Sequence, residues 1–244
     1  MYELSLFSGA GGGLLGTHLL GWTPIGYVEW DDYCQRVLAQ RIADGILPVA
    51  PIFGDVREFA QSGAAREYRG FADVVTAGFP CQPFSVAGKR AGADDERNMW
   101  PATIRVIREV RPPYVLLENV PGLLSGSHGY FGQVLRDLAE SGYDARWRVL
   151  SAAEVGAPHK RDRLWIVATD SHRIGPYREL RSQAAGEPCE RWQNPGRVAD
   201  IRADAELCRA LDGMAYRVDR LKALGNGQVP AVVATVWRLL MEEE

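Results

Sequence analysis

The chain has 244 residues, of which 46% are hydrophobic, and its formal net charge at pH 7 is −3. This length and composition predict one large hydrophobic core with room for a small appendage, and no apolar run is long enough to span a membrane. The charge balance excludes a strongly basic nucleic-acid-binding protein, so any contact with a polyanion must come from local patches.

The N-terminus and the cysteines bear on the cellular compartment. The chain enters a strand-like pattern at once, YELSLF, with no basic stretch or long apolar segment before it, which argues against a secretory signal. Its four cysteines, Cys34, Cys81, Cys189 and Cys208, form no CxxC pair, and their spacing fits neither a zinc site nor a disulfide framework. We therefore expect a reduced, intracellular, cytoplasmic protein without a metal.

Predicted strands and helices alternate from the first residue to about Ala168. In chain order they are a strand at 3–7, a helix at 14–20, a strand at 25–30, a helix at 31–43, a strand at 72–79, a helix at 101–111, a strand at 114–120, a helix at 132–142 and strands at 145–150 and 163–168. A last helix is expected at 230–240, with Pro230 at its start. This alternation predicts an α/β fold with an open, mostly parallel sheet and helices on both faces.

The alternation breaks down between Thr169 and about Ala215, where the sequence is polar and rich in turn formers. This segment is either a small substrate-reading insert or a long loop, and long loops inside compact domains are usually functional. The predicted division is a main domain of residues 1–168 plus 216–244, interrupted by residues 169–215.

The first strand runs into a glycine-rich stretch, SGAGGG, that leads into the next helix. Glycines let the backbone approach a ligand closely, and a helix N-terminus offers unpaired N–H groups. The spacing of Gly9, Gly11 and Gly12 departs from the full dinucleotide pattern, and a plain tight turn is the alternative. Glu29 ends the second strand about 20 residues later, where an acidic residue would bind ribose hydroxyls.

Two further features favour an adenosine-containing cofactor. Trp30 is placed to cover an adenine, and GDV, residues 54–56, supplies another acidic residue at an expected strand end.

Cys81 lies in AGFPCQPFS, just after the predicted strand 72–79. Ligands bind at the carboxyl ends of strands in such sheets, and Pro80 and Pro83 restrict the backbone about the cysteine. Basic residues follow in the same loop and would favour the thiolate. The alternative is a small buried hydrophobe, which is the interpretation we adopt for Cys34 on its helix stripe.

Glu118 ends another apolar strand, so poor solvation is expected to raise its pKa; a cap for the following turn is the alternative. In HKRDRLW, an extended backbone would place His159, Arg161 and Arg163 on one face, although a solvated edge would look the same. LGNGQVP, residues 224–230, is a glycine-rich turn before the last helix.

Taken in order, these stretches resemble the cytosine-5 DNA methyltransferases. The matching stretches are LSLFSGAGG, VEWDDYC, GDV, GFPCQPFS, LLENV, HKRDRLW and GNGQVP, and they extend over nearly all of the chain except residues 169–215. The resemblance implies a Rossmann-like, S-adenosylmethionine-dependent methyltransferase sheet with a small irregular target-recognition insert. It also implies S-adenosylmethionine as methyl donor, S-adenosylhomocysteine as product, and a cytosine flipped out of double-stranded DNA as acceptor.

The resemblance assigns catalytic roles to five residues. Cys81 matches the nucleophile that adds to carbon 6 of the cytosine, and Glu118 matches the acid at ring N3. Asn119 would support that strand end. Arg163 would hold the base's O2 and Glu118, and Arg161 would lie nearer the DNA backbone.

The resemblance also marks the cofactor and DNA contacts. The cofactor set is Phe7, Gly9, Ala10, Gly11, Gly12, Glu29, Trp30, Asp55, Val56, Gly78, Pro80, Trp100, Asn226 and Gly227. Base flipping requires the duplex gap to be filled and the phosphates to be clamped, which the loop 85–97 would do. The expected DNA contacts are Ser85, Lys89, Arg90, Arg97 and Arg161. Candidate readers in the insert are Arg173, Arg178, Arg181, Arg191, Trp192 and Arg197.

The chain departs from the family pattern at a few positions. Ser5 stands where an acidic residue is common, His159 where a glutamine is common, and Gly227 where a serine is common. The segment 169–215 is much shorter than the target-recognition region of many members.

The sequence predicts methylation of carbon 5 of cytosine within a short double-stranded DNA site. The enzyme is expected to be a monomer, and a cognate restriction enzyme is a candidate partner. A tRNA cytosine-5 methyltransferase is the alternative within the fold. A catalytically silent DNA-binding module and a nicotinamide oxidoreductase are the alternatives from other classes.

Overall fold

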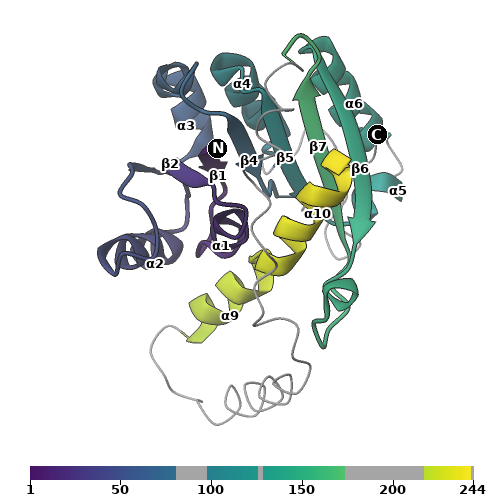
Figure 1. Cartoon of the computed structure of the whole chain (residues 1–244). Coiled ribbons are helices and arrows are strands. Elements are labelled where there is room, and N and C mark those ends of the chain that lie inside the picture. Colours follow the sequence, from purple (N-terminus) through teal and green to yellow (C-terminus); the bar gives the residue numbers. More distant parts are fainter. Residues whose placement is uncertain (81–97, 126–128, 174–216, 243–244) are drawn as a thin grey trace.

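The computed structural model describes residues 1–80, 98–125, 129–173 and 217–242, and Figure 1 shows their arrangement. Seven strands form one sheet in the order β3-β2-β1-β4-β5-β7-β6. Their bounds are β1 Tyr2–Leu6, β2 Thr23–Val28, β3 Ile52–Phe53, β4 Val74–Ala77, β5 Tyr114–Asn119, β6 Tyr143–Leu150 and β7 Arg163–Asp170. The first five strands are parallel, whereas β7 is antiparallel to both β5 and β6.

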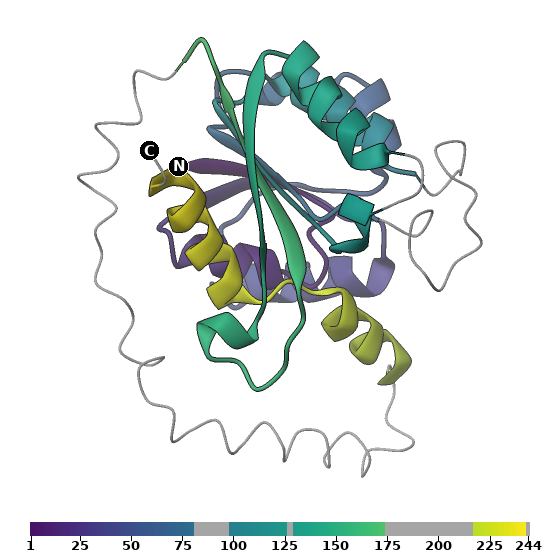
Figure 2. The ribbon, with the colours of Figure 1, turned by 90° about the vertical axis from the view of Figure 1, so that its right-hand side faces the viewer.

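Helices cover both faces of the sheet, with α10 on one side and α6 on the other in Figure 2. The α-helices are α1 Gly12–His18, α2 Asp32–Ala43, α3 Val56–Gln61, α4 Trp100–Val110, α5 Gly122–Ser125, α6 Tyr130–Glu140, α9 Arg217–Asn226 and α10 Pro230–Glu242. The 3-10 turns within the described residues are η1 Ala64–Tyr68 and η4 Ala153–Val155. The larger core packs α3, α4 and α6 on one face, and a second core packs α10 on the other.

Local chemistry accounts for where several helices begin. Asp31 accepts hydrogen bonds from the backbone N–H groups of Tyr33 and Cys34 at the start of α2. Asp55 does the same for Arg57 at the start of α3. These caps satisfy N–H groups that have no partner within the helix, so two acidic residues at strand ends also set the helices that follow them.

The predicted fold class and the predicted elements are confirmed. Every predicted strand and helix is present, with ends that differ by a few residues. The sequence did not predict α3, α5, α9, or the two 3-10 turns, and β3 was expected only as a strand end. The expected turn at 224–230 is shorter than predicted, because α9 continues to Asn226. The division at residues 168 and 216 stays a prediction, since residues 174–216 lie outside the described residues.

The topology brings distant residues to one edge. β1 lies between β2 and β4, and this change in strand order is the place where open α/β sheets bind ligands. Because β7 is antiparallel, its first residue lies at the carboxyl edge of β5, with Leu164 paired to Asn119 and Trp165 to Glu118. The ends of β1, β2, β4 and β5 and the start of β7 therefore meet.

Within the described residues, no helix is both long enough and apolar enough to cross a membrane.

Candidate functional site

A cavity of about 670 Å³ opens at the carboxyl edge of the parallel strands. This volume lies within the usual range for small-molecule sites. Segments far apart in sequence line it, and they include Phe7, Gly9, Val28–Asp31, Cys34, Gly54–Arg57, Gly78–Pro80, Glu118–Val120, Arg163, Asp219, Lys222 and Gly225–Gly227. The cavity is therefore lined both by residues that follow β1 and by residues of α9 and the turn after it.

The glycine loop after β1 forms one wall of this cavity. Gly9 and Gly11 have positive φ, 54° and 85°, which glycine adopts without strain. Gly9 N donates to Glu29 Oε2 at 2.6 Å, and Asp31 N donates to the other oxygen, Oε1, at 2.8 Å. Burial raises the pKa of Glu29, and these two backbone donors counteract it. The two donors thus fix the orientation of the Glu29 carboxyl group just after β2. This is the residue that the sequence predicted to bind ribose hydroxyls.

Trp30 and Asp55 also line the cavity. The Trp30 side chain is 70% exposed, although it lines the cavity, so a flat aromatic face is open there. Asp55 forms an ion pair with Arg57, whose guanidinium holds the pKa of that carboxyl below its usual range. Val56 is buried beside Asp55 and supplies apolar surface.

Glu118 and Arg163 form an ion pair at the junction of β5 and β7. Arg163 Nε lies 2.9 Å from Glu118 Oε1. Burial raises the pKa of Glu118, whereas the charges of Arg163 and Arg161 lower it. The raised pKa predicted from the sequence is confirmed in direction, and the result is a carboxyl group suited to donating a proton or a hydrogen bond.

Asn119 links β5 to the segment that leads to Cys81. Its Nδ2 donates to the carbonyl oxygen of Phe79 at 3.1 Å, and its Oδ1 accepts from Val120 N at 2.9 Å. Asn119 is buried, so both polar ends of the amide are satisfied inside the protein.

Arg161 differs from the sequence-based expectation. It has a φ of 43°, so the backbone is not extended there and the simple alternation of side chains does not hold. One guanidinium nitrogen, Nη2, donates to the carbonyl oxygens of Gly225 and Gly227 at 2.7 and 2.6 Å. Arg161 therefore ties the loop before β7 to the turn between α9 and α10. Its proposed contact with the DNA backbone is untested.

The remaining predicted residues differ in where they lie. Cys81, Ser85, Lys89, Arg90 and Arg97 lie outside the described residues, as do the insert residues Arg178, Arg181, Arg191, Trp192 and Arg197. Pro80, Gly78, Asn226 and Gly227 line the cavity. Trp100 is buried, donates from Nε1 to Asp137 and packs on Phe79, while Ala10, Gly11 and Gly12 belong to the glycine loop.

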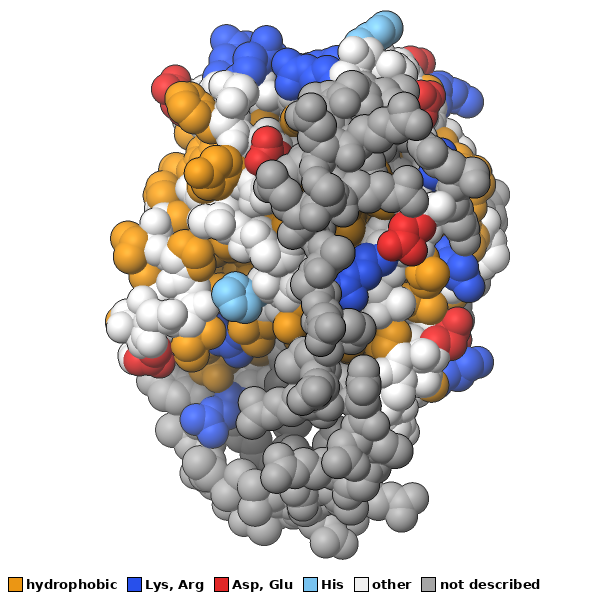
Figure 3. Space-filling view, viewed as in Figure 1, with side chains coloured by type: hydrophobic (Ala, Val, Ile, Leu, Met, Phe, Trp, Pro, Cys, Tyr) orange, Lys and Arg blue, Asp and Glu red, His pale blue; other side chains and the backbone are white. Residues whose placement is uncertain are grey.

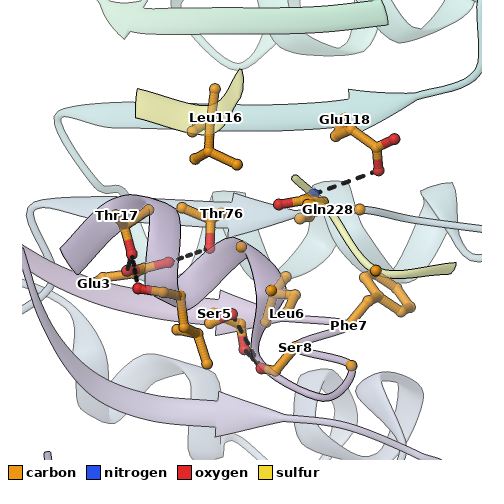
Figure 4. Close-up of a pocket in the computed structure, with 18 of the residues that line it drawn as sticks. Glu3, Ser5, Leu6, Phe7, Ser8, Thr17, Thr76, Leu116, Glu118 and Gln228 are labelled. Atoms are coloured by element: carbon orange, nitrogen blue, oxygen red, sulfur yellow. Dashed lines mark hydrogen bonds between the residues drawn. The ribbon is translucent and has the colours of Figure 1, made fainter. Parts of the chain in front are cut away.

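A smaller pocket adjoins the cavity and is drawn in Figure 4. Ser5, one of the departures from the family pattern, lines it and accepts a hydrogen bond from Ser8 Oγ at 3.0 Å. His159 and Arg173 are exposed.

Several residues at the site were not predicted as functional, and three of them make contacts or fill positions that matter here. Lys222 of α9 lies 2.7 Å from Asp31, Cys34 lines the cavity, and Gln228 reaches Glu118. Cys34 is buried as expected, and burial raises the pKa of its thiol to about 12, which keeps it protonated. The contact between Gln228 and Glu118 was not predicted, because a contact across 110 residues leaves no local sequence pattern. The only sequence signal near Gln228 was the glycine-rich turn GNGQ.

The fold and the site define a class of protein. A glycine loop, a strand-end carboxylate and an open indole border a cavity that is also lined by a partly buried carboxyl–arginine pair. This is the arrangement of open α/β proteins that bind a nucleotide-containing ligand at the carboxyl ends of their strands. The family model described as C-5 cytosine-specific DNA methylase matches residues 1–209. The chain belongs to this family.

Curated relatives agree with that assignment. The type II methyltransferase M.NgoMIV of Neisseria gonorrhoeae is 36% identical over 168 residues, which are 68% of this chain and 51% of that protein. M.AquIA of Picosynechococcus is 37% identical over 67% of this chain and 70% of that protein. The chain spans about half the length of the first relatives it matches.

Solved structures agree on the fold. DNMT2 of Spodoptera frugiperda has a TM-score of 0.57 at 21% identity, covering 72% of this chain and 51% of that one. The methyltransferase EhMeth of Entamoeba histolytica has a TM-score of 0.55 at 16% identity, covering 70% of this chain and 53% of that one.

Proposed function

We propose that this protein methylates carbon 5 of cytosine in a short double-stranded DNA site, with S-adenosylmethionine as methyl donor. The observation that carries the proposal is the partly buried Glu118–Arg163 ion pair, whose two residues line the cavity. Asn119 joins this pair to Phe79, two residues before Cys81. Family membership and the type II relatives support the same reaction.

The residues of the cavity fit the proposed cofactor. The Glu29 carboxylate is fixed by two backbone donors and retains lone pairs for ribose hydroxyls. Trp30 and Val56 offer apolar surface for an adenine, and Asp55 offers an acceptor for its amino group. When bound, S-adenosylmethionine supplies an electrophilic methyl group on a sulfonium.

In the proposed reaction, the Cys81 thiolate forms a bond to carbon 6 of a flipped-out cytosine. Glu118 donates a hydrogen bond or proton to N3, and Arg163 holds O2 together with Glu118. Carbon 5 then becomes nucleophilic enough to take the methyl group. Loss of the carbon-5 proton to solvent and departure of the thiolate restore the aromatic ring. Covalent catalysis of this kind replaces one difficult step by easier ones.

The loop 85–97 is proposed to fill the duplex gap, with Ser85, Lys89, Arg90, Arg97 and Arg161 contacting DNA. Figure 3 shows described Lys and Arg side chains at several places on this face, at its top, along its right side and at its lower left, and the basic residues Arg57, Arg163 and Lys222 line the cavity itself. A monomeric, cytoplasmic enzyme, with or without a cognate restriction enzyme, remains part of the proposal.

Two measurements test this function. Methyl incorporation is measured with duplex DNA and with tRNA, and incorporation into DNA is expected; incorporation into tRNA alone would support the related RNA enzyme instead. Trapping with duplex DNA that carries 5-fluorocytosine is expected to give a stable protein–DNA adduct, because the fluorine cannot leave as a cation. Cys81→Ser is expected to abolish the adduct. Specific DNA binding without methylation or adduct would favour a silent DNA-binding module.

A further inference from the structure

We propose that Gln228 is a positioning residue that fixes the carboxyl group of Glu118 through its side-chain amide. This inference rests on the proposed function, because it adds a residue to the same reaction. Gln228 lies in the turn between α9 and α10, 110 residues from Glu118 in sequence. Figure 4 shows its amide directed at the carboxyl group.

The two carboxyl oxygens of Glu118 have different donors. Gln228 Nε2 lies 3.4 Å from Glu118 Oε2, whereas Arg163 Nε lies 2.9 Å from Oε1. One donor on each oxygen restricts rotation of the carboxyl plane. Arg163 alone would leave that rotation free, because it engages one oxygen.

The surrounding glycines lie close to the Gln228 side chain and leave little further space around it. A Cβ added at Gly78 would lie 2.9 Å from Gln228 Nε2 and 3.0 Å from Glu118 Oε2. A Cβ at Gly13 would lie 2.3 Å from Gln228 Oε1, and one at Gly12 would lie 2.5 Å from the Gln228 carbonyl oxygen. Gln228 is therefore packed between the glycine loop and the end of β4, and contacts Glu118 from that position.

The turn that carries Gln228 is itself anchored by Arg161. Arg161 donates hydrogen bonds to the carbonyl oxygens of Gly225 and Gly227. Gly227 directly precedes Gln228 in the sequence. The turn is thus tied to the loop that leads into Arg163. Among the described residues, the charged groups that act on Glu118 are Arg163 and Arg161, and both lower its pKa. The Gln228 amide lowers it as well, because it donates to the charged form.

The central test is a carbon-13 NMR titration of the glutamate carboxyl groups, with Glu118→Gln identifying the Glu118 signal. Gln228→Met keeps the length of the side chain and removes the amide. We expect the pKa of Glu118 to rise by roughly half to one pH unit in this variant. Gln133→Met makes the same exchange at an exposed position of α6 and is expected to leave this pKa unchanged. An unchanged pKa in Gln228→Met would overturn the proposal.

Kinetics separate positioning from a merely structural role. Gln228→Met is expected to lower kcat about tenfold through misorientation of the acid, and to move the alkaline limb of the pH–rate profile upward. In Gln228→Glu, two adjacent carboxyl groups would share a proton, so activity should be lost at alkaline pH and recovered on acidification. A lower Tm with an unshifted alkaline limb would show a structural role only.

Different results would contradict the positioning role of Gln228 and the proposed function. If the wild type methylates DNA and Gln228→Met titrates like Gln133→Met, the positioning role is wrong and the proposed function stands. If the wild type does not methylate DNA, the proposed function fails, and the NMR titration still decides whether Gln228 acts on Glu118.

Discussion

At the scale of single residues, desolvation raises the pKa of several carboxyl groups, among them those of Glu3 and Glu118. Glu3 lies within β1 and accepts hydrogen bonds from the hydroxyls of Thr17 and Thr76 at 2.5 and 2.6 Å, as Figure 4 shows. Burial nevertheless raises its pKa from 4.5 to about 7, because desolvation outweighs the two hydroxyl donors. Glu3 and Glu118 thus share the same cause of a raised pKa, although only Glu118 borders the larger cavity.

The raised pKa of Glu3 predicts a pH-dependent stability. Because the folded protein binds this proton more tightly than the unfolded chain, the stabilising contribution is complete below the unfolded pKa near 4.5 and is lost as pH rises through about 7. Between pH 5 and pH 8 the wild type should lose roughly 3 kcal/mol more unfolding free energy than Glu3→Gln, which cannot titrate. Urea unfolding at several pH values measures both. A difference that does not change with pH would contradict this prediction.

At the scale of elements, close contacts hold the site together. Asn119 joins the end of β5 to Phe79 after β4, and both residues are buried. Asn119→Asp replaces the Nδ2 donor by an acceptor facing the Phe79 carbonyl oxygen. We expect a loss of about 1–3 kcal/mol in unfolding free energy, together with a lower kcat. Asn119→Ala separates the loss of the hydrogen bonds from the added charge and should be less harmful. Equal stability of Asn119→Asp and the wild type would contradict the assignment.

The packing of α1 against α10 depends on Gly16. A Cβ at Gly16 would lie 2.6 Å from Val233 Cβ and 2.7 Å from the Pro230 carbonyl oxygen, so α10 would have to move. Gly16→Ala is expected to destabilise the protein by about 1–3 kcal/mol, despite the better helix propensity of alanine. Gly132→Ala in α6 is the matched control, because no atom lies within 4 Å of its added Cβ. It should be neutral or stabilising by up to about 1 kcal/mol, as thermal unfolding would show.

The sequence predicted elements with strong periodicity and missed those without it. β3 has two residues, and α9 has a predominantly polar sequence, so neither gives a clear hydrophobic pattern. Glu29, Trp30 and Glu118 were found because strand ends can be read from apolar runs. The partners of Arg161 and Gln228 were not found, because they depend on contacts across more than 60 residues.

At the scale of the whole molecule, one cavity connects the two ends of the chain. Phe7 and Gly9 follow the first strand, whereas Asn226 and Gly227 precede the last helix, and all four line the cavity. The ion pair between Lys222 and Asp31 adds a second link between α9 and the start of α2. A ligand in this cavity would therefore contact several distant segments that come together only in the folded protein. Because such a ligand binds the folded state and not the unfolded chain, its binding raises the free energy of unfolding.

This linkage predicts the response to S-adenosylhomocysteine. At a concentration of about 100 times its Kd, the compound should raise the unfolding free energy by about 2.7 kcal/mol. Glu29→Gln places an amide group against the backbone donors of Gly9 and Asp31, so binding should weaken about tenfold. The same concentration would then stabilise that variant by about 1.4 kcal/mol. Thermal unfolding with and without ligand measures both proteins, and NAD at equal concentration serves as the control. Stabilisation by NAD but not by S-adenosylhomocysteine would favour a nicotinamide oxidoreductase and contradict the cofactor proposed here.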